Sequence, residues 1–208
     1  MNLKTKRILA YSVDLFIISL LVWMISSINV LNPNKDKYQK VYNEYVEYYE
    51  ANLSNTTIVP EDLINDEYAG YMHDLSYYSV SSIVIEVLVI ILYFTLFPRF
   101  NNDQTVGKRL FKIKVISDNH KRVPIWKYLI RALLIPIFAN VLLYNSVATI
   151  LNVGAIFIFK GIPYLYANLI ITYAFNFYCY ADILVSFVRK DNRSLHDILT
   201  RTRVVELC

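Results

Sequence analysis

Three long apolar stretches divide the chain, and each contains a single charged residue. They cover residues 8–31, 79–98 and 164–188, and their charges are Asp14, Glu86 and Asp182. A helix needs about 20 largely apolar residues to cross a bilayer. Each stretch therefore predicts a transmembrane helix, and the first lacks the small-residue cleavage site of a signal peptide.

A fourth apolar stretch, residues 124–159, is too long for one ordinary span. Basic residues lie in its first part, and Pro136 removes a backbone donor just after them. We therefore expect an interfacial amphipathic helix over 125–135. A fourth span then covers residues 137–159.

Charge is distributed unevenly between the segments that join these spans. Of the net charge of +4, residues 1–7 contribute +3, residues 99–127 contribute +6, residues 189–208 contribute +2, residues 32–78 contribute −6, and the remaining residues contribute −1. Cytoplasmic loops of membrane proteins carry an excess of Lys and Arg. We therefore expect a cell-membrane protein with both termini, the loop 99–124 and the tail 189–208 in the cytoplasm, and the loop 32–78 outside.

Composition agrees with a membrane protein, because 56% of the residues are hydrophobic and only 18% are charged. The length leaves no room for a second folded enzyme domain. In the outer loop, tyrosine and other apolar positions recur every three to four residues between Tyr38 and Leu53, which predicts an amphipathic helix. This acidic, tyrosine-rich loop is either a solvated cap or a vestibule that collects cations.

Ionisable residues inside a span are costly, so their positions indicate where function lies. Asp14 comes seven residues after Arg7, and Asp182 comes seven before Arg189, which places both carboxylates about 10 Å inside the cytoplasmic boundary. Arg7 and Arg131 could reach inward to neutralise them. One hypothesis is a structural lock of Arg–Asp pairs, and the other is a cation or proton site.

Glu86 lies about 12 Å from the outer face and has no basic residue near it on its own helix. It is either a protonated side chain that bonds a neighbouring helix or part of a proton relay. The single histidines His120 and His196 lack further ligands at zinc spacing, and no glycine-rich phosphate loop is present. We expect no metal and no cofactor.

Apolar residues alternate with lysines over residues 110–116, which predicts a half-exposed strand. Residues 121–124 could return as a second strand, and residues 202–207 could add a third. The fold class expected is an all-α membrane protein with four transmembrane helices, a cytoplasmic amphipathic helix and a small cytoplasmic β element.

Several short motifs together resemble the RDD family of integral membrane proteins. They are Lys6-Arg7-Ile8-Leu9-Ala10-Tyr11 with Asp14, Thr105-Val106-Gly107-Lys108-Arg109, Arg131 in Ile130-Arg131-Ala132, and Arg193-Ser194-Leu195-His196-Asp197. The family name refers to one Arg and two Asp residues. Arg7 and Asp14 match the first pair, and either Asp182 or Asp197 could be the second Asp. The resemblance implies transport of an unidentified ligand.

Two hypotheses for function follow. The first is a small transporter, for which exchange of cations for protons is one mode, and its candidate binding residues are Arg7, Asp14, Glu86, Arg131 and Asp182. The second is a membrane scaffold whose charges are structural. No nucleophile–base pair indicates an enzyme. The expected partners are the bilayer, anionic lipid headgroups, a small ligand or cation, and a second copy of the chain, but no nucleic acid.

Overall fold

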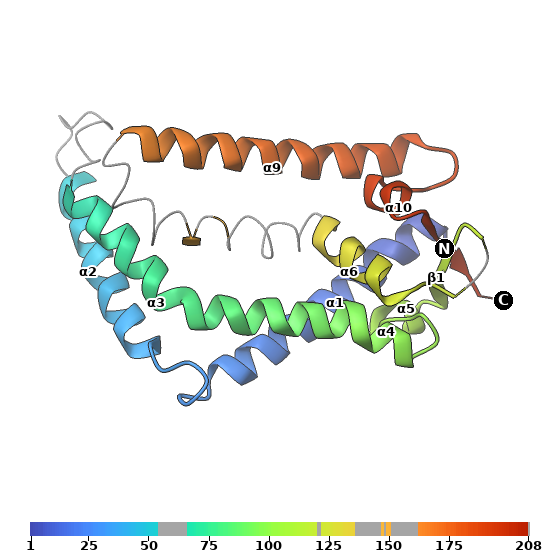
Figure 1. Ribbon diagram of the computed structural model, residues 1–208, viewed down its shortest axis with the longest axis horizontal. Helices are drawn as coiled ribbons and strands as arrows, with labels where there is room; N and C mark the ends of the chain where they lie inside the picture. The colour runs from blue at the N-terminus through green and yellow to red at the C-terminus, as the bar shows by residue number, and fades with distance from the viewer. Residues whose placement is uncertain (54–65, 120–121, 136–146, 148, 151–161, 208) are drawn as a thin grey trace.

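Apolar sequence forms three helices that are long enough to cross a membrane. The computed structural model describes residues 1–53, 66–119, 122–135, 147, 149–150 and 162–207. Within these residues, the apolar helices cover Leu3–Ser26, Gly70–Phe100 and Ile170–Val188. Figure 1 shows the second and third of them lying along the long axis of the molecule.

The described chain is mainly helical, with one small sheet. In order, its elements are α1 (Leu3–Ser26), α2 (Lys35–Leu53), α3 (Asp66–Ile91), the π-helix η1 (Leu92–Leu96), α4 (Phe97–Phe100), α5 (Val106–Leu110), β1 (Ile113–Ser117), α6 (Ile125–Leu134), α9 (Ile162–Val188), α10 (Leu195–Leu199) and β2 (Thr202–Glu206). The predicted helices over 38–53 and 125–135 are confirmed as α2 and α6.

Two predicted boundaries differ from the structure. The first apolar helix ends at Ser26 instead of residue 31, and residues 28–32 form a turn in which Leu31 N and Asn32 N both donate to Ile28 O. Pro33 follows this turn, and a proline cannot continue a helix without losing a backbone hydrogen bond. The predicted start of the second span, residue 79, lies inside α3, which together with α2 occupies most of the described part of segment 32–78.

The fourth predicted span, 137–159, lies almost wholly outside the described residues. The last predicted span, 164–188, begins slightly earlier in the structure, at Ile162, and ends at Val188. Tyr178 on α9 donates a 2.5 Å hydrogen bond to the carbonyl of Leu134 at the end of α6. This contact joins α9 to the rest of the bundle.

A π-helical turn interrupts the long second span just before Pro98. The amide of Phe97 donates to Leu92 O, five residues back. Pro98 has no amide hydrogen, so the carbonyl four residues before it has no intrahelical partner and the helix can widen there. The three central residues of this turn, Tyr93, Phe94 and Thr95, are all buried.

The sheet pairs two segments that are far apart in the sequence. β1 and β2 run antiparallel, with Val115 opposite Val204 and Ser117 opposite Thr202. The predicted return strand over 121–124 is wrong for its described residues, 122–124, because the partner of β1 is the C-terminal strand. In the core beside the sheet, Ile113 and Val115 of β1 and Val204 of β2 are buried together with Ala10 of α1.

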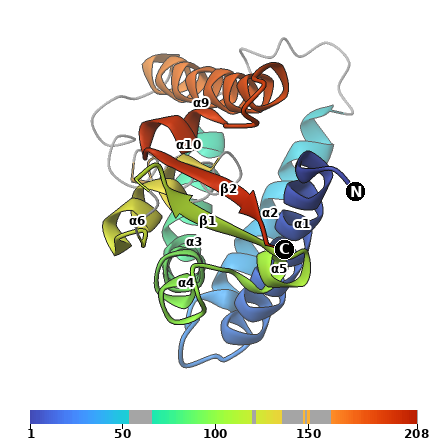
Figure 2. The same cartoon turned by 90° about the vertical axis from the view of Figure 1, so that its right-hand side faces the viewer.

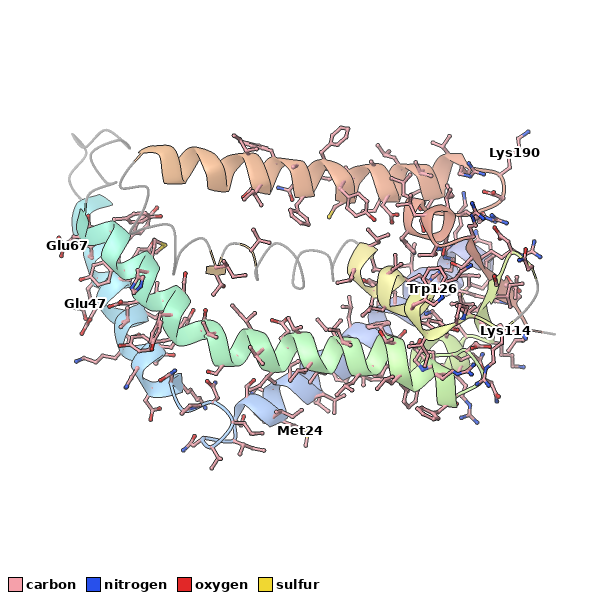
Figure 3. All side chains as sticks on the ribbon, viewed as in Figure 1. Met24, Glu47, Glu67, Lys114, Trp126 and Lys190 are labelled. Carbon is pink, nitrogen blue, oxygen red and sulfur yellow. The ribbon has the colours of Figure 1, made fainter. Side chains whose placement is uncertain are left out.

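The two ends of the molecule carry opposite charges. Figure 3 places Glu47 and Glu67 at one end, and Lys114 and Lys190 at the other. The N-terminus, α5, α10 and both strands gather at the second end, as Figure 2 shows from that side. We call this second end the basic end.

Candidate functional site

Asp14 lies fully buried on α1, where it receives three hydrogen bonds from other elements. Tyr93 Oη donates at 2.6 Å, Thr105 Oγ1 at 2.6 Å and Gly107 N at 2.8 Å. The amides in the first turn of a helix have no intrahelical acceptor, so α5 offers one of them to the carboxylate. Asp14 is therefore stabilised by neutral donors, and it joins α1 to η1 and α5.

Gly107 makes this contact possible because no side chain fits at its position. A Cβ atom there would lie 2.0 Å from Ala10 O and 2.9 Å from Asp14 Oδ1. The glycine of the sequence motif is thus explained by the close approach of α5 to α1. Thr105, which caps α5 through Lys108 N at 3.4 Å, comes from the same motif.

Asp197 on α10 forms ion pairs with Arg7 and Arg131. Arg7 Nη2 lies 2.7 Å from Asp197 Oδ2, and Arg131 Nη1 contacts Asp197 Oδ1 and the hydroxyl of Thr202. Burial alone would raise the pKa of Asp197, but the surrounding basic groups, of which Arg131 contributes most, hold that pKa well below its usual range. The carboxylate is completely buried and joins α1, α6 and α10.

Asp182 on α9 is held by His196 of α10. Its Oδ1 accepts a 2.9 Å hydrogen bond from His196 N, and His196 Nδ1 lies 3.0 Å from the same oxygen. The side chain of Asp182 is 4% exposed. This pair fixes the end of α9 against the short helix that follows it.

The structure does not show the expected pairing of arginines with Asp14 and Asp182. Arg7 and Arg131, which we expect from the sequence to neutralise Asp14 and Asp182, both contact Asp197, and Arg189 contacts Asp191 at 2.8 Å. Seven-residue spacing places two side chains on the same helix face, but Arg7 lies near the helix end, where residues of the C-terminal tail reach it. The motif residue Arg193 contacts Asp118 at 2.9 Å.

A cavity of about 390 Å³ lies at the basic end, between α1, α6 and α9. Asp14 and Asp182 both line it, as the shared depth of the two carboxylates predicts. Four basic side chains line it as well, and they are Lys4, Arg7, Lys108 and Arg131. With two acidic and four basic side chains, the lining favours an anion.

Among the basic residues that line the cavity, Lys108 makes the fewest side-chain contacts with described residues. Its Nζ lies 5.9 Å from the centre of the Phe94 ring, and within the described part of the chain it has no hydrogen-bond acceptor. Burial and the nearby charge of Arg131 lower the pKa of Lys108 to about 8. An anion beside Lys108 would compensate for this loss of hydration.

Glu86 lies apart from this cluster, half-buried on α3. It does not line the cavity, and no described residue gives it a hydrogen bond or an ion pair. Sequence reasoning missed Tyr93, Thr105 and Thr202 as contacts of the charged residues. Thr105 has a sequence signal, because a threonine immediately before a helical turn is a typical N-cap. Tyr93 and Thr202 have none.

Comparison with known proteins identifies a family and no individual relative. The model of the RDD family matches residues 4–201. Neither the curated proteins nor the solved structures include a match to this chain. The matched region includes all the residues that contact Asp14, Asp182 and Asp197. The chain belongs to the RDD family of membrane proteins.

Proposed function

We propose that this protein transports a small anion, which binds in the cavity at the basic end. The observation that carries the proposal is the Lys108 ammonium, which borders a cavity lined by three further basic side chains and has no acceptor among the described residues. A charge that is partly withdrawn from water and has no partner among the described residues is costly. A bound anion removes that cost, because it supplies the missing partner.

The carboxylates at the cavity already accept hydrogen bonds, which favours an anion over a cation as the ligand. Both oxygens of Asp14 accept hydrogen bonds, and Asp182 accepts from His196. A metal ion in the cavity would have to displace these donors. By contrast, the hydrogen bonds that Arg131 makes with described residues use Nη1 alone, so its other nitrogens remain available to an anion.

For cation-for-proton exchange, the sequence offers Glu86 as a candidate carboxylate, but Glu86 does not line this cavity.

A scaffold is the second candidate function, and one observation favours it. Asp14, Asp182 and Asp197 each connect a helix of the bundle to an element of the basic end. These contacts are compatible with transport, because a transporter also needs a rigid binding site.

The proposal is non-enzymatic, although Ser194, His196 and Asp182 lie close together. Ser194 Oγ is 3.0 Å from both ring nitrogens of His196, so it lies beside the carbon between them and off the axis of either nitrogen. Ser194 also donates to Asp197 Oδ2 at 3.1 Å. His196 is thus poorly placed to remove the proton of this hydroxyl.

Binding of inorganic phosphate by the purified protein tests the proposal. At constant ionic strength, phosphate should raise the thermal unfolding temperature of the protein in detergent, because a ligand of the folded state stabilises it. Lys108→Gln should lose this response. Lys114→Gln is the matched control, since Lys114 lies on β1 and does not line the cavity.

Flux measurements in proteoliposomes separate the candidate functions. Uptake of labelled phosphate that requires Lys108 supports anion transport. Sodium-driven proton flux that Glu86→Gln abolishes, without any response to phosphate, would overturn the proposal in favour of cation exchange. Phosphate binding without any flux would favour the scaffold.

A further inference from the structure

The cavity at the basic end is lined by both basic and apolar side chains. The basic side chains come from α1, α5 and α6, and the apolar lining includes Ile8, Phe94, Ile135, Ile183 and Phe187. An inorganic anion would match the basic groups and leave the apolar lining without an apolar contact. A ligand with an anionic group and a hydrocarbon part matches both.

Part of the apolar lining is exposed on two of the helices that bound the cavity. Ile8 on α1 is 55% exposed, and Ile183 and Phe187 on α9 are 47% and 55% exposed. Both helices are apolar and long enough to cross a membrane. In a bilayer, the exposed surface of these lining residues would connect the cavity with the hydrocarbon.

We expect the basic groups near the start of α1 to lie at the depth of lipid headgroups. Lys4 Nζ donates a 2.9 Å hydrogen bond to the carbonyl of Phe187, next to the last residue of α9, and lies 5.6 Å from the centre of its ring. The start of α1 and the end of α9 therefore lie at one level. Ile183 is five residues before the end of α9, about 8 Å further into the membrane at the rise of an α-helix.

The size of the cavity fits a headgroup and the first part of an acyl chain. Ligand pockets range from about 300 to 1,000 Å³, and this one is about 390 Å³. Such a volume is too small for a whole phospholipid, whose chains would extend through the opening between α1 and α9. Charge complementarity selects an acidic headgroup over a zwitterionic one.

From these observations we infer that the anion bound in this cavity is the headgroup of an acidic phospholipid, which enters from the adjoining leaflet between α1 and α9. The inference rests on the proposed anion site and names its ligand class. Lys108 contacts the phosphate group, and Ile183 and Phe187 contact the first carbons of the chain.

Native mass spectrometry of the full chain in detergent tests the inference. The probes are phosphatidylglycerol, phosphatidylcholine and water-soluble inorganic phosphate. Phosphatidylglycerol should bind more tightly than phosphatidylcholine. Lys108→Gln should weaken phosphatidylglycerol by about fivefold or more, the effect of one basic residue near a charged lipid. Ile183→Ser should weaken the lipid and leave phosphate unchanged.

Two control variants match these changes. Lys114→Gln removes one positive charge away from the cavity, and Leu88→Ser changes an exposed apolar residue of α3 that does not line it. Lys108→Arg should keep binding and shows that the site tolerates a changed side chain. Size-exclusion profiles and unfolding temperatures establish that each variant is folded.

Each outcome decides one question. If phosphate binding needs Lys108 but phosphatidylglycerol binds no better than phosphatidylcholine, the lipid inference is overturned and the small-anion function stands. If Lys108→Gln and Lys114→Gln reduce phosphatidylglycerol binding equally, the lipid is held by nonspecific charge and the inference is overturned. If no probe binds, the inference and the proposed function both fail.

Discussion

Tyr93 donates a 2.6 Å hydrogen bond to Asp14 Oδ1, and 79 residues of chain separate the two. Tyr93 belongs to the π-helical turn of the second span, and Asp14 belongs to the first span. The bond places a buried carboxylate among neutral donors, so the aspartate of the family motif acts here as a junction between helices.

Removing this junction should cost stability. Tyr93→Phe deletes one donor to a buried charge, and such hydrogen bonds contribute about 1.5–3 kcal/mol. Asp14→Asn should cost a similar amount, because its amide would face donors. In a double-mutant cycle measured by thermal unfolding, the two losses should be less than additive. Tyr77→Phe, at an exposed position of α3, should change the unfolding temperature little. Strict additivity of the Tyr93→Phe and Asp14→Asn losses would contradict the hydrogen bond.

Gly107→Ala should destabilise the protein through a clash. The added methyl group would lie 2.0 Å from Ala10 O, so α5 must move away from α1. Forcing an extra methyl group into a packed site costs about 1–3 kcal/mol or more. Gly70→Ala is the matched control, since nothing lies within 4 Å of a Cβ there. Equal unfolding temperatures for the two variants would refute the close approach.

Asp197 should make stability fall in acid. Its pKa is lowered in the folded protein from about 3.9 in the unfolded chain, so its contribution is complete above that value and is lost as the pH falls below about 4. Asp197→Asn removes one partner of a buried ion pair, which costs about 3–5 kcal/mol at pH 7.

Unfolding measured between pH 3 and pH 7 checks this prediction. The stability of Asp197→Asn should depend less steeply on pH than that of the unchanged protein. Asp36→Asn, an exposed carboxylate in the first turn of α2, should keep the original slope. Parallel profiles for all three proteins would contradict the role assigned to Asp197.

Lys108 should make stability rise in base when no ligand is bound. Burial and the charges of Arg131 and Arg7 lower its pKa to about 8, while Asp14 and Asp197 oppose them. The unfolded lysine has a pKa of about 10.4. Below pH 8 the folded protein therefore carries an unfavourable charge, and stability increases as the pH rises from about 8 to 10.4.

Lys108→Met should remove this rise and unfold at a higher temperature than the unchanged protein at pH 7. Lys114→Met should behave like the unchanged protein. Binding of phosphate should also weaken above pH 8, because the neutral amine no longer attracts an anion. A rise that persists in Lys108→Met would assign it to another group.

The basic end should face the cytoplasm. Labelling of single cysteines in intact cells tests this prediction. The cysteines are introduced by Lys114→Cys or Glu47→Cys after Cys179→Ser and Cys208→Ser have removed the native thiols. Each reports on which side of the membrane its end of the molecule lies. An impermeant reagent should label the cysteine at position 47 and spare the one at 114, because basic segments remain inside. The reverse pattern would invert the topology.

Much of the fold follows from local patterns. The apolar run around Asp14 predicts a helix, because a helix satisfies all the backbone hydrogen bonds of a single membrane-spanning segment within that segment. The tyrosine spacing of α2 and the amphipathic pattern of α6 predict helices for the same kind of local reason. The end of α1 at Ser26 was less predictable, because apolar residues continue to Leu31 and the turn depends on contacts with Asn32.

Pairing across the chain was less predictable than the elements. The short turn before residues 121–124 predicts that they pair with β1, yet β2 takes that place. Likewise, a spacing of seven residues places Arg7 and Asp14 on one helix, while the tail brings Asp197 into contact with Arg7. Sequence distance says nothing about which distant segment fills a given space.

The amino-acid sequence alone determines the apolar helices, the segregation of charge and the family, because these depend on composition and on motifs of a few residues. The tertiary structure decides which donor meets which carboxylate, and it leaves Lys108 beside a cavity without a partner among the described residues. The physical reason is that burial and hydrogen bonding are set by the segments that pack together, and at the basic end these come from both ends and the middle of the chain.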